Sequence, residues 1–280
     1  MATTGIAKLE RYGLLHAAGE DARAFLHAQL TNDIENLPPA KARYAGWCSA
    51  KGRLLATFLV MPYRGGFLLQ LSRDLVPTVA KRLSMFILRS KVKLTDASGE
   101  WTQHAVWGEN GGEPLAVREQ DGKITVTIER GRSLLLVPAA GAQVSANASE
   151  DDWALAEVRA GRPLIEQPTQ DQFVPQMVNL ELAGGVDFHK GCYPGQEIVA
   201  RAQYRGAVKR RMYHLRGAVL KPGQELYSDD APGQPSGMVV NAAGQESLAV
   251  LQTSAVEAKT PIRTQPQAAP LEVLPLPYGQ

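Results

Sequence analysis

Cysteine is scarce in this chain, which has only Cys48 and Cys192 among its 280 residues. Two cysteines cannot build the disulfide framework of a small secreted protein. The sequence also lacks any C-x-x-C pair. A closed zinc site or a firmly held iron–sulfur cluster needs three or four protein ligands, which His189 and Cys192 do not supply within one chain. We therefore expect no bound metal and two reduced thiols.

Long apolar runs are absent as well. No segment approaches the roughly 20 apolar residues of a transmembrane helix. The N-terminus, M-A-T-T-G-I-A-K-L-E-R-Y, lacks the apolar run of a signal peptide. The formal net charge is only +2, so no overall field draws the chain to nucleic acid or to a membrane. These absences predict a cytoplasmic protein.

One segment, residues 190–201, is dense in special residues and reads K-G-C-Y-P-G-Q-E-I-V-A-R. Its two glycines allow tight-turn or left-handed backbone close to a ligand. Positive charge beside Cys192, above all from Lys190, favours the thiolate and makes a thiol reactive. A free cysteine is otherwise commonly a small buried hydrophobe, and we interpret Cys48 in that way. We interpret Cys192 as the functional thiol.

The longer run 175–201, P-Q-M-V-N-L-E-L-A-G-G-V-D-F-H-K-G-C-Y-P-G-Q-E-I-V-A-R, resembles the signature of the YgfZ proteins. These are folate-binding relatives of the glycine-cleavage T-protein, an aminomethyltransferase, and are tied to iron–sulfur enzyme maintenance and tRNA modification. The K-G-C-Y-x-G-Q-E core is specific, because such a run with a cysteine rarely matches by chance. Weaker matches cover residues 25–34, 50–55, 157–163 and 271–278.

The resemblance implies tetrahydrofolate or a related reduced folate as the ligand. A folate needs a flat slot for its pterin, polar groups for the ring edge and positive charge for its glutamate carboxylates. Tyr12 and Trp153 match positions where aromatic residues line this slot in the family, although either could instead be a core aromatic. The other residues that the resemblance assigns to the ligand are Asn179, Lys190, Gly191, Tyr193, Gly195, Gln196, Glu197 and Arg201.

A basic run follows the signature, with no acidic residue before Glu225. Such a run is often a solvated face of strands and loops. The alternative is an anion site, either for a polyglutamate tail on folate or for RNA phosphates. The run consists of Arg201, Arg205, Lys209, Arg210, Arg211, Arg216 and Lys221.

Two departures separate the chain from a true aminomethyltransferase. The T-protein's catalytic aspartate follows a Gly-Gly turn, whereas the matching stretch 52–56 reads G-R-L-L-A, without a carboxylate. Its folate-ring glutamate lies in a P-x-E segment, whereas Met177 takes that place after Pro175. Aminomethyl transfer is therefore not expected. A retained folate cavity is expected, in which Asn179 or Gln176 replaces part of the glutamate's function.

The pattern of elements predicts an α+β fold. Residues 12–95 follow a β-α-β-β-α-β order that resembles a ferredoxin-like split unit, with an amphipathic helix over 75–89. A short helix is expected over 153–160, with Asp152 as its N-cap and Gly161 just past its end.

Two domains follow from these elements and from the resemblance. Residues 1–205 are predicted to form an aminomethyltransferase-like folate-binding domain. From residue 208 onward, strand-like runs alternate with Gly-Pro turns, which favours a C-terminal β-barrel domain over 206–280.

The leading hypothesis is a folate-dependent accessory factor for assembly or repair of iron–sulfur enzymes, including tRNA-modifying ones. Its partners would be folate and iron–sulfur enzymes or cluster-assembly proteins, with Cys192 as the working thiol. One alternative is a transferase for a one-carbon unit carried by tetrahydrofolate, with Cys192 as nucleophile. Another, less favoured, is an RNA-binding module that uses the arginines after Cys192. A membrane partner is not expected.

Overall fold

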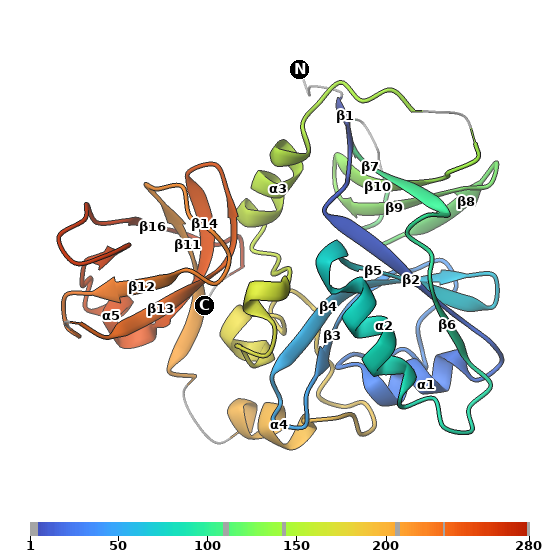
Figure 1. Ribbon diagram of the computed structural model, residues 1–280, viewed down its shortest axis with the longest axis horizontal. Coiled ribbons are helices and arrows are strands. Elements are labelled where there is room, and N and C mark those ends of the chain that lie inside the picture. Colours follow the sequence, from blue (N-terminus) through green and yellow to red (C-terminus); the bar gives the residue numbers. More distant parts are fainter. Residues whose placement is uncertain (1–4, 109–111, 142–143, 205–207, 232, 279–280) are drawn as a thin grey trace.

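The computed structural model describes residues 5–108, 112–141, 144–204, 208–231 and 233–278. In this part of the chain the strands form three sheets, which we call the first, second and third sheets. Figure 1 shows the first and second sheets stacked on one side of the molecule and the third on the other. Helix α3 (Glu150–Arg159) lies between the two sides.

The first sheet has the strand order β3-β4-β5-β2-β6 and is buried on both faces. Side chains alternate between faces along a strand. Leu15 and Ala17 of β2 join the core shared with helices α1 and α2, whereas Tyr12 and Leu14 join the core shared with the second sheet. The elements are β2 (Tyr12–Ala18), α1 (Ala22–Gln29), β3 (Arg43–Cys48), β4 (Leu54–Tyr63), β5 (Gly66–Ser72), η1 (Arg73–Leu75), α2 (Val76–Ser84) and β6 (Lys93–Asp96). They extend the predicted β-α-β-β-α-β unit by one strand.

Helix α2 is shorter than the predicted 75–89, because it ends at Ser84. Its buried stripe ends with Leu83. The backbone N–H groups of Met85 and Phe86 then donate to carbonyls three residues back, which tightens the chain into turns. Both side chains are exposed, and Ile87 after them is only partly buried against the core.

The second sheet has the order β1-β7-β10-β9-β8 and covers the other face of the first sheet. Their shared core includes Leu14 and Leu68 from the first sheet and Ala105 and Leu134 from the second. The strands are β1 (Gly5–Lys8), β7 (Trp101–Trp107), β8 (Val117–Gln120), β9 (Lys123–Glu129) and β10 (Arg132–Pro138).

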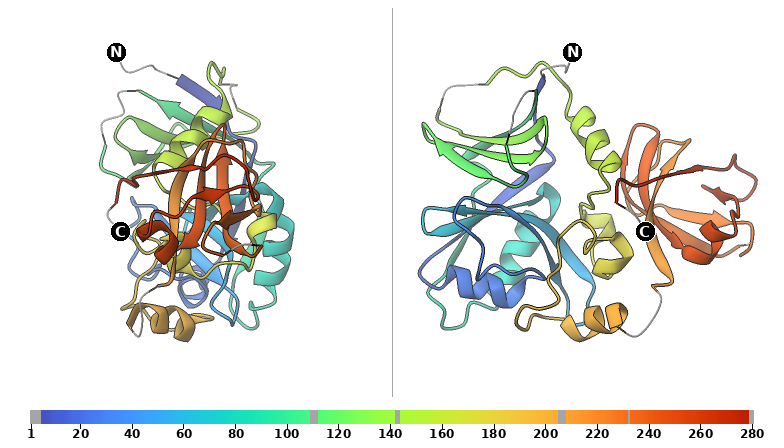
Figure 2. Two further views of the ribbon diagram at one scale, coloured as in Figure 1. Left: turned by 90° about the vertical axis from the view of Figure 1, so that its left-hand side faces the viewer. Right: turned by 180° about the vertical axis from the view of Figure 1, so that it is seen from behind.

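The third sheet has the order β15-β12-β13-β14-β11-β16 and curls on itself (Figure 2). A bridge between Ile262 and Leu271 joins its two edges, and Leu226, Val239 and Leu251 pack inside it. The predicted C-terminal barrel is thereby confirmed. Its elements are β11 (Arg210–Arg216), β12 (Glu225–Ser228), β13 (Pro235–Ala243), β14 (Glu246–Gln252), α5 (Thr253–Glu257), β15 (Ile262–Arg263) and β16 (Glu272–Leu274).

The segment between the second and third sheets starts with α3, which packs against β13 and β14. The N-cap of α3 is Ser149 rather than the predicted Asp152. Ser149 Oγ accepts from the N–H of Asp151, while Asp152 accepts from the N–H of Ser149, so the pair forms a capping box. Gly161 follows the helix with φ +66°, as predicted.

The rest of that segment contains η2 (Gln167–Thr169), η3 (Pro175–Val178) and α4 (Gln196–Tyr204). Helix α4 was not predicted and occupies the second half of the signature. The domain boundary predicted between residues 205 and 206 falls outside the described residues.

Candidate functional site

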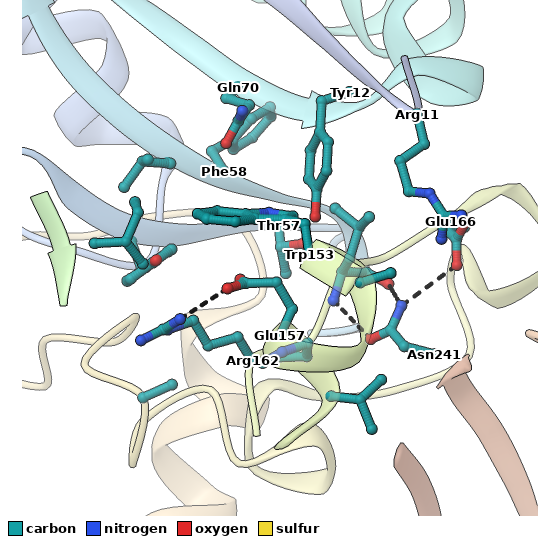
Figure 3. Close-up of a pocket in the computed structure, with 18 of the residues that line it drawn as sticks. Arg11, Tyr12, Thr57, Phe58, Gln70, Trp153, Glu157, Arg162, Glu166 and Asn241 are labelled. Carbon is teal, nitrogen blue, oxygen red and sulfur yellow. Dashed lines mark hydrogen bonds and ion pairs between the residues drawn. The ribbon is translucent and has the colours of Figure 1, made fainter. Parts of the chain in front are cut away.

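A pocket lies where the first sheet, helix α3 and the third sheet meet (Figure 3). Strands β2 and β4 supply one wall, α3 and the loop after it supply another, and β13 contributes residues from the third sheet. The empty space amounts to about 880 Å³, counted out to the open mouth.

Two aromatic residues singled out from the sequence line this pocket. Trp153 of α3 and Tyr12 of β2 are 4% and 8% exposed. Figure 3 shows the Tyr12 hydroxyl pointing toward the indole of Trp153. The guanidinium carbon of Arg132 lies 4.6 Å from the Trp153 ring centroid, and Trp107 meets the indole edge-on at 5.7 Å between centroids. These contacts fix the indole as a flat wall.

The hydroxyl of Tyr12 is a hydrogen-bond donor at neutral pH. Burial raises the pKa of Tyr12, and the nearby Glu157 carboxylate raises it further. The phenol therefore stays protonated. An acceptor on a ligand in this pocket would find a fixed donor there.

The third sheet contributes Asn241 to the opposite side of the pocket. Its Oδ1 accepts from the N–H of Leu164 at 2.8 Å, and its Nδ2 donates to the Leu164 carbonyl at 2.7 Å and to Glu166 at 3.3 Å. Burial raises the pKa of Glu166, and Asp74 adds to the rise, whereas the hydrogen bond from Asn241 opposes it. A partly buried carboxyl thus lines the pocket.

A ring of four charged residues supports the pocket beside Trp153. Arg132 contacts Glu129 and Glu157, each at 2.6 Å, and Arg162 contacts the same two carboxylates at 2.5 and 2.8 Å. Burial alone would lower the pKa of Arg162, but Glu157, Tyr44 and Glu129 raise it above its usual value. Arg162 stays charged, and the ring joins the β9–β10 hairpin to α3 and the loop after it.

The second part of the signature, residues 190–201, lies elsewhere. Among the described residues, none from 190 to 201 lines the pocket. Lys190 Nζ donates to the backbone carbonyls of His27 and Leu30, at the C-terminal end of α1, and lies 4.9 Å from the Tyr193 ring centroid. Burial lowers the pKa of Lys190 to about 8, although Asp33, Asp187 and Cys192 act in the opposite direction.

The signature glycines differ in what surrounds them. Gly195 has φ +78°, and a Cβ there would lie 2.4 Å from the Ser49 carbonyl oxygen and 2.6 Å from the Cα of Gly52. The backbone of the signature therefore packs directly on the turn 49–52. Gly191 has only His27 within 4 Å of an added Cβ. Gln196, Glu197 and Arg201 belong to α4.

The two cysteines lie in opposite environments. Cys192 is exposed in the irregular segment before α4, whereas Cys48 is buried at the end of β3. Burial raises the pKa of Cys48 to about 12, and Asp171 adds to this effect. Cys48 is therefore a core residue, as expected, and Cys192 is the accessible thiol.

Asn179 is fully buried, and its Nδ2 donates to the Met212 carbonyl at 2.8 Å. Asn179 does not line the pocket, although its neighbour in sequence, Leu180, does. The structure thus brings Tyr12 and Trp153 together and leaves the other ligand residues predicted from the sequence outside this pocket. A role for those residues in ligand binding stays a prediction.

The basic residues after the signature fall into two groups among the described residues, those that form ion pairs and those that do not. Arg211 pairs with Glu181, and Arg216 pairs with Glu272 at 2.7 Å. Arg201, Lys209 and Arg210 have no ion pair with a described residue. Arg205 falls outside the described residues.

The described residues contain neither a metal-ligand cluster nor a membrane-spanning helix. They contain no group of three or more His, Cys, Asp or Glu side chains that could hold a metal ion. No helix in them is long and apolar enough to span a membrane.

Comparison with curated proteins decides the family. The tRNA-modifying protein YgfZ of Edwardsiella ictaluri is 30% identical, over 98% of this chain and 92% of that protein. The protein of the same name from Klebsiella pneumoniae is also 30% identical, over 97% of this chain and 92% of that protein. The chain belongs to the YgfZ family. No family model matches it.

The fold agrees with this assignment. The glycine cleavage system aminomethyltransferase T from Bartonella henselae superposes with a TM-score of 0.75, over 99% of this chain and 87% of that chain, at 14% identity. At that identity the match shows the fold alone. It confirms the aminomethyltransferase-like fold that the YgfZ resemblance implied.

Several pocket residues of this YgfZ-family chain were not singled out from the sequence. Glu157 and Arg162 belong to the E-V-R-A-G-R-P motif, so a signal for them was present. Asn241 belongs to strand β13, although residues 241–244 were predicted as a turn, and Glu166 sits in a loop. Only the contact between the third sheet and this loop reveals them.

Proposed function

We propose that the pocket binds a reduced folate, tetrahydrofolate or a close relative. The observation that carries the proposal is the fixed indole of Trp153, which lines the pocket together with the Tyr12 phenol. A flat heteroaromatic ring stacks on such a wall. Glu166 and Asn241 supply polar groups for a ring edge, and Arg11, which also lines the pocket and pairs with Asp151 at 3.0 Å, is the basic residue nearest a carboxylate tail at that side.

We further propose that the protein is a cytoplasmic accessory factor for assembly or repair of iron–sulfur enzymes, including those that modify tRNA. The name of its relatives supports the link to tRNA modification. Cys192 is the proposed working thiol, because it is the accessible one. It does not line the folate pocket, which disfavours Cys192 as nucleophile toward a one-carbon unit held there. Partner proteins would meet the thiol at the surface.

A titration with tetrahydrofolate tests the folate proposal. Binding should change tryptophan fluorescence, and Trp153→Phe should lose most of that change and weaken binding. Trp101→Phe is the matched control, since Trp101 is also buried but packs against Tyr63 in another part of the core. Absence of binding into the millimolar range by calorimetry would contradict the proposal.

Complementation tests the accessory role. A strain without its own protein of this family should regain cluster-dependent tRNA thiolation and resistance to oxidants with the wild-type chain. Cys192→Ser should fold but fail, whereas Cys48→Ala should complement if it folds, because Cys48 is a core residue. Glycine cleavage should be unaffected throughout. Full rescue by Cys192→Ser would show that the thiol is dispensable.

A further inference from the structure

A second cleft opens between the turn before β4 and the start of β11, away from the folate pocket. Arg53 lines it from the turn before β4 and Arg210 from the start of β11, Glu225 contributes a carboxylate, and Phe173 and Met238 contribute apolar surface. Its empty space is about 680 Å³, counted out to its mouth. Two guanidinium groups far apart in sequence therefore line one cleft.

Neither arginine forms an ion pair with a residue that the structure describes. Arg53 Nη1 donates to the backbone carbonyls of Asp171 at 3.3 Å and Gln172 at 3.1 Å, which orients the guanidinium without using a carboxylate. Arg210 is exposed and makes no ion pair with any residue in the described ranges. Its neighbour Arg211, by contrast, pairs with Glu181.

Further exposed cations and an aromatic ring lie on the neighbouring helix α4 and just before β11. Helix α4 sits on the same turn as Arg53, because a Cβ on Gly52 would lie 2.7 Å from Ile198. Tyr204, on the last turn of α4, is 68% exposed and meets Phe188 edge-on. Figure 1 places α4 at the lower edge of the molecule, below the β3–β4 hairpin. The exposed basic residues of this region are Lys51, Arg53, Arg201, Lys209 and Arg210, and its exposed acidic residues are Asp171, Glu197 and Glu225.

We propose that this surface, defined by Arg53, Arg210, Lys209, Arg201 and Tyr204, binds RNA, with phosphates at the arginines and an unpaired base on Tyr204. Fixed guanidinium groups pair with phosphate oxygens through two parallel hydrogen bonds. Single-stranded RNA offers unstacked bases that stack on exposed aromatic rings. The inference deepens the tRNA-related part of the proposed function. It is independent of folate binding, because the two clefts have no lining residue in common.

Fluorescence anisotropy with a labelled unmodified tRNA transcript and a single-stranded RNA of about 12 nucleotides tests this surface. We expect affinity to fall steeply with salt. Arg53→Gln and Arg210→Gln should each weaken binding about tenfold and lower the slope of log K against log salt by roughly 0.7. Tyr204→Ala should weaken binding by about fivefold or more, while Tyr204→Phe should retain it.

The control is Arg118→Gln or Arg130→Gln, each of which removes one charge at an exposed arginine, on β8 or in the β9–β10 turn, that makes no ion pair with a described residue. This control should bind RNA as the wild type does. Equal losses in the control and the cleft variants would overturn the assignment, as would equal affinity for polyglutamate, which would indicate an acidic protein as partner. No RNA binding with folate binding intact would overturn this inference alone. Thermal unfolding of each variant shows that it is folded.

Discussion

Gly195 and Gly52 meet backbone to backbone, so that a Cβ on Gly195 would lie 2.6 Å from the Cα of Gly52. Both have positive φ, +78° and +68°. The contact joins the signature around Cys192 to the K-G-R turn, two motifs about 140 residues apart that only glycine can bring so close. The position of the thiol therefore depends on this contact.

Gly195→Ala should destabilise the protein by about 3 kcal/mol or more, because a left-handed φ and a backbone collision act together. Gly65→Ala is a matched control, since Gly65 has the same φ of +78° but no atom within 4 Å of an added Cβ. It should cost only about 1 to 2 kcal/mol. Urea unfolding measures both losses, and losses of equal size would show that the Gly195–Gly52 contact is unimportant.

Arg132→Gln should lower the free energy of unfolding by about 3 kcal/mol, because Glu129 and Glu157 then share Arg162 as their one remaining guanidinium partner and one negative charge in the ring is left uncompensated. It should also shift Trp153 fluorescence, since the guanidinium lies over that ring. Arg118→Gln, an exposed arginine, should change stability by less than about 0.5 kcal/mol. A silent Arg132→Gln would mean that the ring does not support the pocket wall.

Iodoacetamide at neutral pH should label Cys192 well before Cys48. Burial restricts access to Cys48 and raises its pKa to about 12, so almost no thiolate forms there. Peptide mass analysis after a limiting dose distinguishes the two sites, and both should react in denaturant. Preferential labelling of Cys48 in the folded protein would contradict the assignment of the accessible thiol.

Glu246 should contribute stability that acid removes. The hydrogen bond from Arg159 lowers the pKa of Glu246 from 4.5 to about 2, against burial and with help from His214. A lowered folded-state pKa means that the contribution is complete above about pH 4.5 and is lost as the pH falls toward 2.

Melting temperature measured against pH checks this expectation. Glu246→Gln should be less stable than the wild type at neutral pH, and the difference should narrow below pH 4.5. Glu272→Gln, which breaks the exposed pair with Arg216, should change little at any pH. A constant difference between Glu246→Gln and the wild type across the range would contradict the assignment.

Local sequence patterns predicted much of the fold. The strand-like run at β2 and the Gly-Pro turns after residue 208 predicted strands correctly, because each reflects a local rule. Helix α4 was not predicted, because the glycines and the proline just before it favour a loop. Helix α2 was drawn too long, because Ile87 and Leu88 continue the apolar pattern past Ser84.

The site was harder to predict than the fold. Trp153 and Tyr12 follow from the resemblance and line the same pocket. The approach of Arg132 to Trp153 depends on how β10 docks against α3, which no local pattern encodes. Most of the other predicted ligand residues were chosen because they belong to the signature. In the structure Lys190 contacts the end of α1 instead, and Gly195 contacts the 49–52 turn.

The hydrogen bonds from Asn241 to Leu164 and Glu166 make the third sheet a structural part of the pocket. Any ligand held there binds only the docked arrangement, so occupancy and docking form one linked equilibrium. An empty pocket leaves the barrel held by its remaining contacts, whereas a filled one adds the ligand's own binding energy to the junction. A higher concentration of such a ligand would therefore favour the arrangement in which the third sheet is docked on the rest of the chain.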